Sequence, residues 1–161
     1  MLGGGGSKIA PDAYATAVCS HVKGWLDQIK QRVGDLQKAV SPNTSPSQGK
    51  DLIRSYLDGV ISDTDDMIDG IKNAGTPDVP NGDQIANTLV SGLEQARSTF
   101  QDARSQADSL PTNSRSAFGQ AAQQLGSSIN SKVNGVQNAF QGINSPQLDQ
   151  AFNKSSACQG A

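Results

Sequence analysis

Four long stretches of this chain lack proline and repeat apolar residues at alternating steps of three and four. That spacing places one stripe of side chains along a single face of a helix, and the stripe must then pack against other helices. The alternation that is typical of strands is nowhere sustained. The repeating residues are, stretch by stretch, Val18, Val22, Trp25, Ile29, Val33, Leu36 and Val40; Ile53, Leu57, Val60, Thr64, Met67, Ile71 and Ala74; Ile85 or Ala86, Leu89, Leu93, Ala96, Phe100, Ala103, Ala107 and Leu110; and Phe118, Ala122, Leu125, Ile129, Val133, Val136, Phe140 and Ile143.

Turn-forming clusters separate these stretches, because Pro fixes φ and lacks an N–H while Gly and Asn accept left-handed backbone. Ser45 before Pro46 is typical of a helix start, and Asn81 and Asn113 are candidate caps. Gly75 can end the second helix. Long helices joined by short loops run antiparallel to their neighbours. We therefore predict an all-α, up-down antiparallel four-helix bundle with a short fifth C-terminal helix, over residues 12–40, 46–74, 82–109, 113–143 and 146–154.

Glycines inside the predicted helices fit this fold least well. Each costs a helix up to about 1 kcal/mol relative to alanine. Beside the apolar stripe, a glycine or alanine lets two helices approach closely, so the core is expected to be thin. The glycines are Gly24, Gly34, Gly59, Gly70, Gly92, Gly119, Gly126, Gly135 and Gly142.

The chain has two cysteines, Cys19 in the first predicted helix and Cys158 beyond the fifth. In an up-down bundle of four helices, the first helix starts at the end where the fourth finishes, so the topology brings the two sulfurs together. A disulfide closing a loop of roughly 140 residues stabilises a fold by about 4 to 5 kcal/mol in the chain-entropy model. The alternative is two unrelated buried thiols. Since disulfides persist in oxidising compartments, we expect an extracytoplasmic protein.

The charge balance argues against nucleic acid as a partner. The chain has 13 Lys and Arg against 15 Asp and Glu, a net charge of −2, and only 4% aromatic residues. Nucleic-acid binding needs an excess of basic residues on one face, and single-strand binding needs aromatic stacking platforms. No apolar run of about 18 residues is present, so we expect no membrane-spanning segment.

Residues that perform acid–base or metal chemistry are scarce. His21 is the only histidine and Glu94 the only glutamate, which leaves no zinc, di-iron or catalytic-triad pattern. Residues 63–70 look like a calcium loop, but Ile68 and Ala74 stand where such a loop needs Gly and Glu. Asp58, Ser62, Asp65 and Asp69 would line one face of the helix. A solvated surface is the preferred interpretation of this face, and weak divalent-cation binding is the alternative. We predict no catalytic, cofactor-binding or metal-binding residue, and no enzyme.

Trp25, with Tyr14 and Tyr56, belongs either to the core or to a binding cluster. The position of Trp25 on the apolar stripe favours the core.

Residues 1–8 form a Gly/Ser-rich leader that we expect to be flexible, and residues 9–161 form a single helical domain. The leader is either a cloning remnant or the tether of a lipoprotein whose lipid-bearing cysteine is missing.

Several motifs resemble small secreted actinobacterial proteins, many of them predicted lipoproteins. They are Trp25 near Cys19, the AGTPDVPNG loop at 74–82, Leu110-Pro111, and Ser145-Pro146-Gln147-Leu148 before Cys158. The resemblance covers nearly all of residues 12–158. It implies an extracytoplasmic location and the disulfide, and it transfers no catalytic residue because the family has no established activity.

The chain is thus expected to be a monomeric, non-catalytic binding or scaffold domain of the cell envelope, with membrane contact only through a lipid anchor. Its partner would be an envelope protein that recognises a helix face or the loop from Pro77 to Pro80. Alternatively, it carries a lipid or another apolar molecule between its helices. Small stripe residues could leave room for such a ligand: Ala86, Ala96, Ala103, Ala107 and Ala122.

The cysteine pair is testable by mass. We expect the intact mass of the purified chain to rise by two hydrogen atoms on reduction, because one bond between Cys19 and Cys158 is broken. Mass spectrometry with and without a reductant measures this directly. Two free thiols in protein refolded under air would contradict the pairing.

Overall fold

The computed structural model describes residues 8–136, 143 and 145–159. Within these residues the chain is mostly helical, with one very short parallel strand pair. The elements are β1 (Lys8–Ile9), α1 (Pro11–Ala39), α2 (Pro46–Ala74), β2 (Thr76–Pro77), α3 (Gly82–Asp108), α4 (Arg115–Val136), α6 (Pro146–Lys154) and the 3-10 turn η1 (Ser156–Cys158).

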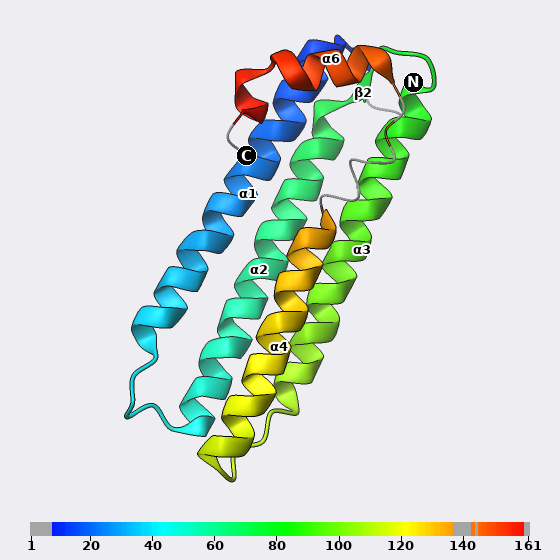
Figure 1. Ribbon diagram of the computed structural model, residues 1–161. Coiled ribbons are helices and arrows are strands. Elements are labelled where there is room, and N and C mark those ends of the chain that lie inside the picture. Colours follow the sequence, from blue (N-terminus) through cyan, green and yellow to red (C-terminus); the bar gives the residue numbers. More distant parts are fainter. Residues whose placement is uncertain (1–7, 137–142, 144, 160–161) are drawn as a thin grey trace.

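The four long helices lie side by side, and each packs on the next one along the chain (Figure 1). Helix α6 crosses the end of the molecule where α1 begins, and both α6 and η1 pack against α1. The predicted all-α class is therefore confirmed. The fourth predicted helix needs correction, since α4 begins at Arg115 and Ile143 is not helical. The rest of its predicted end, residues 137–142, lies outside the described residues.

At the helix starts, serine side chains form capping hydrogen bonds and the asparagines expected to cap do not. Ser45 accepts a hydrogen bond from the backbone N–H of Gln48, whose side chain accepts one from the Ser45 N–H, which completes a capping box. Asn81 precedes α3 in a left-handed conformation (φ 62°), without a side-chain cap. The proposed Asn113 cap is wrong, because Ser114 accepts the hydrogen bond from the Ala117 N–H at 3.0 Å.

The predicted stripes meet in one core. Leu57, Leu89, Leu93 and Phe100 are completely buried, and Trp25 is 1% exposed. The rings of Trp25 and Phe100 lie 6.3 Å apart between centroids, in tilted contact. The prediction that Trp25 belongs to the core is confirmed.

The strands β1 and β2 tie the start of the chain to the loop between α2 and α3. Lys8 is paired with Thr76 and Ile9 with Pro77, so the expected leader ends one residue earlier than predicted. Thr76 and Pro77 are buried. The first part of the expected recognition loop is therefore inside the fold, and Asp78 donates its N–H to the carbonyl oxygen of Ile9 at 2.8 Å.

Three glycines of α2 form notches, meaning that a side chain of a neighbouring helix lies where a Cβ would be. A Cβ at Gly59 would overlap the guanidinium of Arg32, and one at Gly70 would overlap the ring of His21, both on α1. A Cβ at Gly49 would press into the ring of Phe118 on α4. Close approach thus accounts for these glycines, whereas Gly24, Gly34, Gly119 and Gly126 face open space.

A pair of glycine substitutions tests this packing. A Cβ at Gly82 would overlap the backbone carbonyl oxygen of Pro77, which cannot swing aside. We expect Gly82→Ala to lower the free energy of unfolding by about 1 to 3 kcal/mol. Gly24→Ala, which meets no atom, should raise it by up to about 1 kcal/mol. Urea unfolding of both variants measures these changes, and equal effects would contradict the close approach at Gly82.

Candidate functional site

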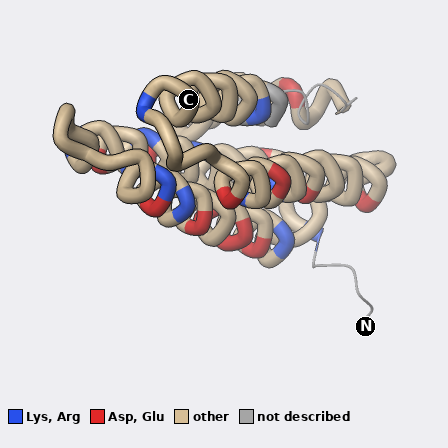
Figure 2. The backbone as a smooth tube through the Cα atoms, turned by 90° about the horizontal axis from the view of Figure 1, so that it is seen from below, with Lys and Arg blue, Asp and Glu red and all other residues tan. Residues whose placement is uncertain are grey.

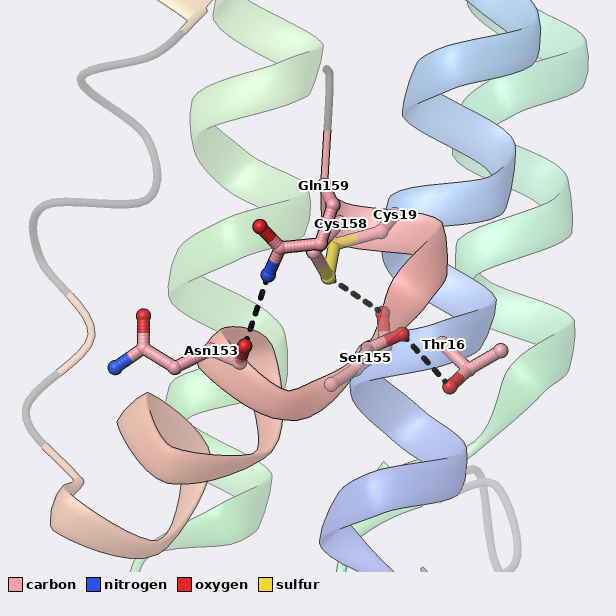
Figure 3. The surroundings of a disulfide bond; sticks show 7 residues. Thr16, Cys19, Asn153, Ser155, Cys158 and Gln159 are labelled. Atoms are coloured by element: carbon pink, nitrogen blue, oxygen red, sulfur yellow. Dashed lines mark hydrogen bonds between the residues drawn. A yellow bond between two sulfur atoms is a disulfide. The ribbon is translucent and has the colours of Figure 1, made fainter.

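The predicted disulfide between Cys19 and Cys158 is present and fastens the C-terminal segment to α1 (Figure 3). The two Cα atoms are 5.0 Å apart across a sequence separation of 139 residues. Beside the bond, the hydroxyls of Thr16 and Ser155 are hydrogen-bonded at 3.1 Å. The Gln159 amide donates to the Asn153 carbonyl oxygen at 2.8 Å. This end of the molecule is therefore held by covalent and polar contacts and has the features of a structural clamp.

The best candidate for a functional site is an apolar groove between α1, α2 and α4, in the half of the molecule away from the disulfide. Its volume is about 310 Å³. Its lining side chains are apolar or aromatic except for the amide of Asn130, and Gly126 contributes only backbone. The lining residues are Ile29, Val33, Leu36, Ile53, Tyr56, Ala122, Leu125, Gly126, Ile129 and Asn130.

The groove exists because the ring of helices is not closed. Helix α4 packs against α3, but within the described residues α1 and α4 make no extended contact. The apolar stripes of α1 and α4 consequently face a shared space, and Val33 and Leu36 remain only half-buried. On α4, small residues at Ala122 and Gly126 leave that space unfilled, and a Cβ at Gly126 would meet no atom.

Of the alanines expected to leave room for a ligand, Ala122 alone lines this groove. Ala96, Ala103 and Ala107 are buried instead, where their small size permits tight helix packing.

A second, more polar hollow of about 250 Å³ adjoins the groove. The two share Leu36 and Tyr56 as walls. The second hollow is lined by Arg32, Asp35, Leu36, Ala39, Leu52, Ser55 and Tyr56.

An ion pair between a partly exposed arginine and a buried aspartate borders this second hollow. The guanidinium of Arg32 donates from Nε to Asp63 at 2.5 Å and from Nη2 at 3.1 Å, and Asp63 is only 6% exposed. The hydrogen bond to Asp63 is the main reason why the pKa of Arg32 is raised. Burial raises the pKa of the Tyr56 hydroxyl, and the nearby charge of Arg32 opposes that shift. The bidentate contact fixes the direction of the Arg32 side chain.

The aromatic residues do not form one binding cluster. The indole N–H of Trp25 donates to the Thr64 hydroxyl at 2.9 Å, and that hydroxyl donates to the Val60 carbonyl oxygen at 2.7 Å. Trp25 is thus satisfied inside the core. Tyr14 is completely buried, and of the three only Tyr56 lines the groove.

The residues that were considered as metal ligands instead make contacts between helices. His21 lies over Gly70, and Asp65 accepts from Arg97 on α3 at 2.8 Å. Asp63, which lies outside the expected solvated face, is buried and forms an ion pair with Arg32. In the part of the chain that the structure describes, no three His, Cys, Asp or Glu side chains gather as metal ligands would.

Helix α4 differs from the others in charge. Its charged residues are Arg115 and Lys132, and it has no acidic residue. Figure 2 shows charged residues spread along several helices, while one long helix is almost wholly uncharged. Arg115 donates to the carbonyl oxygens of Pro42 and Thr44, at the loop between α1 and α2.

Over the described ranges, no helix combines the length and hydrophobicity needed to cross a bilayer. Comparison of the chain with models of protein families, with curated proteins and with solved structures gives no match in any of the three. The function therefore has to be inferred from the groove, its polar neighbour and the disulfide.

Sequence reasoning missed the groove and the pair between Arg32 and Asp63. The groove depends on which two helices remain apart, and the pair joins residues on different helices. The nearest signals were Gly126 next to the apolar stripe of α4 and the aspartate at position 63 next to the apolar stripe of α2.

The buried hydroxyl of Tyr14 gives a test of this end of the core. It has no hydrogen-bond partner in the part of the chain that the structure describes, and burial raises its pKa to about 12. We expect Tyr14→Phe to keep or raise the free energy of unfolding, by up to about 1 kcal/mol, because an unpaired buried hydroxyl is removed.

The pH dependence of stability provides the second readout. The unfolded chain releases the Tyr14 proton near pH 10, its ordinary value, while the folded chain keeps it until about pH 12. Stability is therefore fully present below pH 10 and falls as the pH rises toward 12. Tyr14→Phe should lose part of this dependence and keep the part due to Tyr56. A variant that is clearly destabilised at neutral pH would mean that the hydroxyl has a partner.

Proposed function

We propose that this protein is a non-catalytic binding domain that holds an apolar small molecule in the groove between α1, α2 and α4. The observation that supports this function best is the groove itself. Ligand sites in proteins are concave, have volumes from about 300 Å³ upward and combine apolar walls with a few polar groups. The groove has a volume of about 310 Å³, with apolar walls from three helices and two polar groups at Tyr56 and Asn130.

We interpret the four long helices as an up-down antiparallel bundle that is left open along the side where α1 and α4 face each other. Bundle proteins commonly place ligands among facing helices. In a closed bundle the half-buried side chains of Val33 and Leu36 would pack against the opposite helix. Here an apolar ligand would cover them and remove their surface from water, which is the favourable term in its binding.

We place the protein outside the cytoplasm, as a monomeric domain of the cell envelope that is secreted or lipid-anchored. The disulfide between Cys19 and Cys158 supports this location, because cytoplasmic thiols are kept reduced. The lipid anchor and the resemblance to actinobacterial lipoproteins remain part of the same hypothesis.

A protein-binding scaffold is the second candidate. Its supporting observation is that the groove is open to solvent, so that a side chain from a partner's helix could enter it. A scaffold would also be expected to expose a sizeable apolar patch. Among the described residues, Val40 is the one large apolar side chain that is exposed, at 50%. The small-molecule function is therefore preferred.

Filling the groove should weaken binding. We expect wild-type protein to enhance the fluorescence of N-phenyl-1-naphthylamine, a neutral apolar probe, and Gly126→Phe to reduce its affinity about tenfold or more. The new ring would enter open space in the groove, so the fold should survive.

The matched control is Gln123→Phe, which adds the same ring to an exposed site on α4 that does not line the groove. It should leave the affinity unchanged. Equal loss in both variants, or no binding by the wild type, would contradict the proposed site.

A further inference from the structure

The two adjoining hollows differ in chemistry, and this difference bears on the shape of a ligand. The groove is apolar, while the hollow beyond Leu36 and Tyr56 contains the charges of Arg32 and Asp35 and the hydroxyl of Ser55. A molecule that matched both would have an apolar chain and a polar head. The following inference rests on the proposed function of the groove.

The charges of the second hollow leave no free cation for an anionic head. Arg32 is the one positively charged residue that lines either of these two hollows. Both Nε and Nη2 of Arg32 donate to Asp63, and the guanidinium lies in the notch at Gly59. Turning Arg32 toward a ligand would leave the buried carboxylate of Asp63 unpaired, which is strongly unfavourable.

Asp35 adds a second negative charge beside this pair. It lines the same hollow and is exposed, and its charge contributes to the raised pKa of Arg32. Asp63, which lies behind the wall of the hollow, already neutralises the charge of Arg32, so the negative charge of Asp35 is left without a partner among the lining residues. A carboxylate or phosphate head would be repelled there, while a hydroxyl head could bond to Ser55 and an ammonium head to Asp35.

We propose that the occupant of the groove is a single-chain amphiphile whose head carries no negative charge. Its chain lies among Ile29, Val33 and Ile129, and its head lies past Tyr56 beside Asp35 and Ser55. This head site, and not the groove, would disfavour free fatty acids, because their carboxylate heads are negatively charged.

Three ligands with the same twelve-carbon chain length test the head. Monododecanoylglycerol, dodecyltrimethylammonium and dodecanoate would each displace N-phenyl-1-naphthylamine below their micelle-forming concentrations, at about pH 8, where the carboxylate is ionised. We expect the glycerol ester and the ammonium to bind at least about tenfold more tightly than dodecanoate. The two tight ligands also distinguish a hydroxyl head from a cationic one.

Two charge-reversal variants locate the head. Asp35→Lys changes the hollow from negative to positive, and should improve dodecanoate relative to the glycerol ester by about tenfold while weakening the ammonium. Asp27→Lys is the matched control, since it makes the same charge change at an exposed site of α1 that lines neither hollow. It should leave the order of the three ligands unchanged.

The outcomes separate this inference from the proposed function. If all three ligands bind equally, or if Asp35→Lys and Asp27→Lys behave alike, while Gly126→Phe still blocks binding, the groove stands and the head site is wrong. If none of the ligands binds the wild type, or Gly126→Phe has no effect, the proposed function fails and this inference fails with it.

Discussion

The close approach of α1 to α2 is the contact on which the rest of the structure depends. It is possible because Gly59 and Gly70 of α2 have no side chains where Arg32 and His21 of α1 come to lie. Arg32 then reaches the buried Asp63, and the bidentate contact fixes α1 against α2. Among the described residues, α2 packs on α1 and on α3, and α4 packs on α3, so the side between α1 and α4 is left without an extended helix contact. The groove lies along this side because α1 and α4 pack on other helices and not on each other.

The disulfide and the groove occupy opposite halves of α1, and the arrangement has a physical logic. At the start of α1, Cys158, α6 and η1 hold the helix, so this end does not depend on contact with α4. Farther along, at Ile29 and Val33, no covalent crosslink draws α1 toward α4. A chain with a thin apolar core would otherwise lose stability by leaving a stripe uncovered, and a crosslink of long span can offset that loss.

The chemistry that the proposed function needs is modest and is present. Apolar walls supply affinity, and Tyr56 supplies a polar group at the edge of the groove. Under this proposal the ion pair at Arg32 would make the polar end selective, because a guanidinium that already donates to Asp63 is not available to an anion. The nearly uncharged α4 adds no counter-charge to the groove that it lines.

The sequence alone determined the helices and the covalent link between the chain ends. Periods of three and four, together with Pro and Ser at the starts, are local signals, so α2 and α6 begin and end where they were predicted. The pairing of Cys158 with Cys19 could be predicted because the same signals led us to expect helices that run in alternating directions. The end of the fourth helix at Ile143 and the cap at Asn113 were misplaced, because neighbouring Ser and Pro residues compete for those positions.

Only the tertiary structure decided which pair of helices stays apart. An apolar stripe looks the same in the sequence whether it meets a helix or faces a groove, so Leu125 could not be distinguished from Leu93. The notches at Gly59 and Gly70 likewise have meaning only once α1 lies across them. The groove proposed as the ligand site is therefore a property of helix pairing, which is set by contacts between residues far apart in the chain.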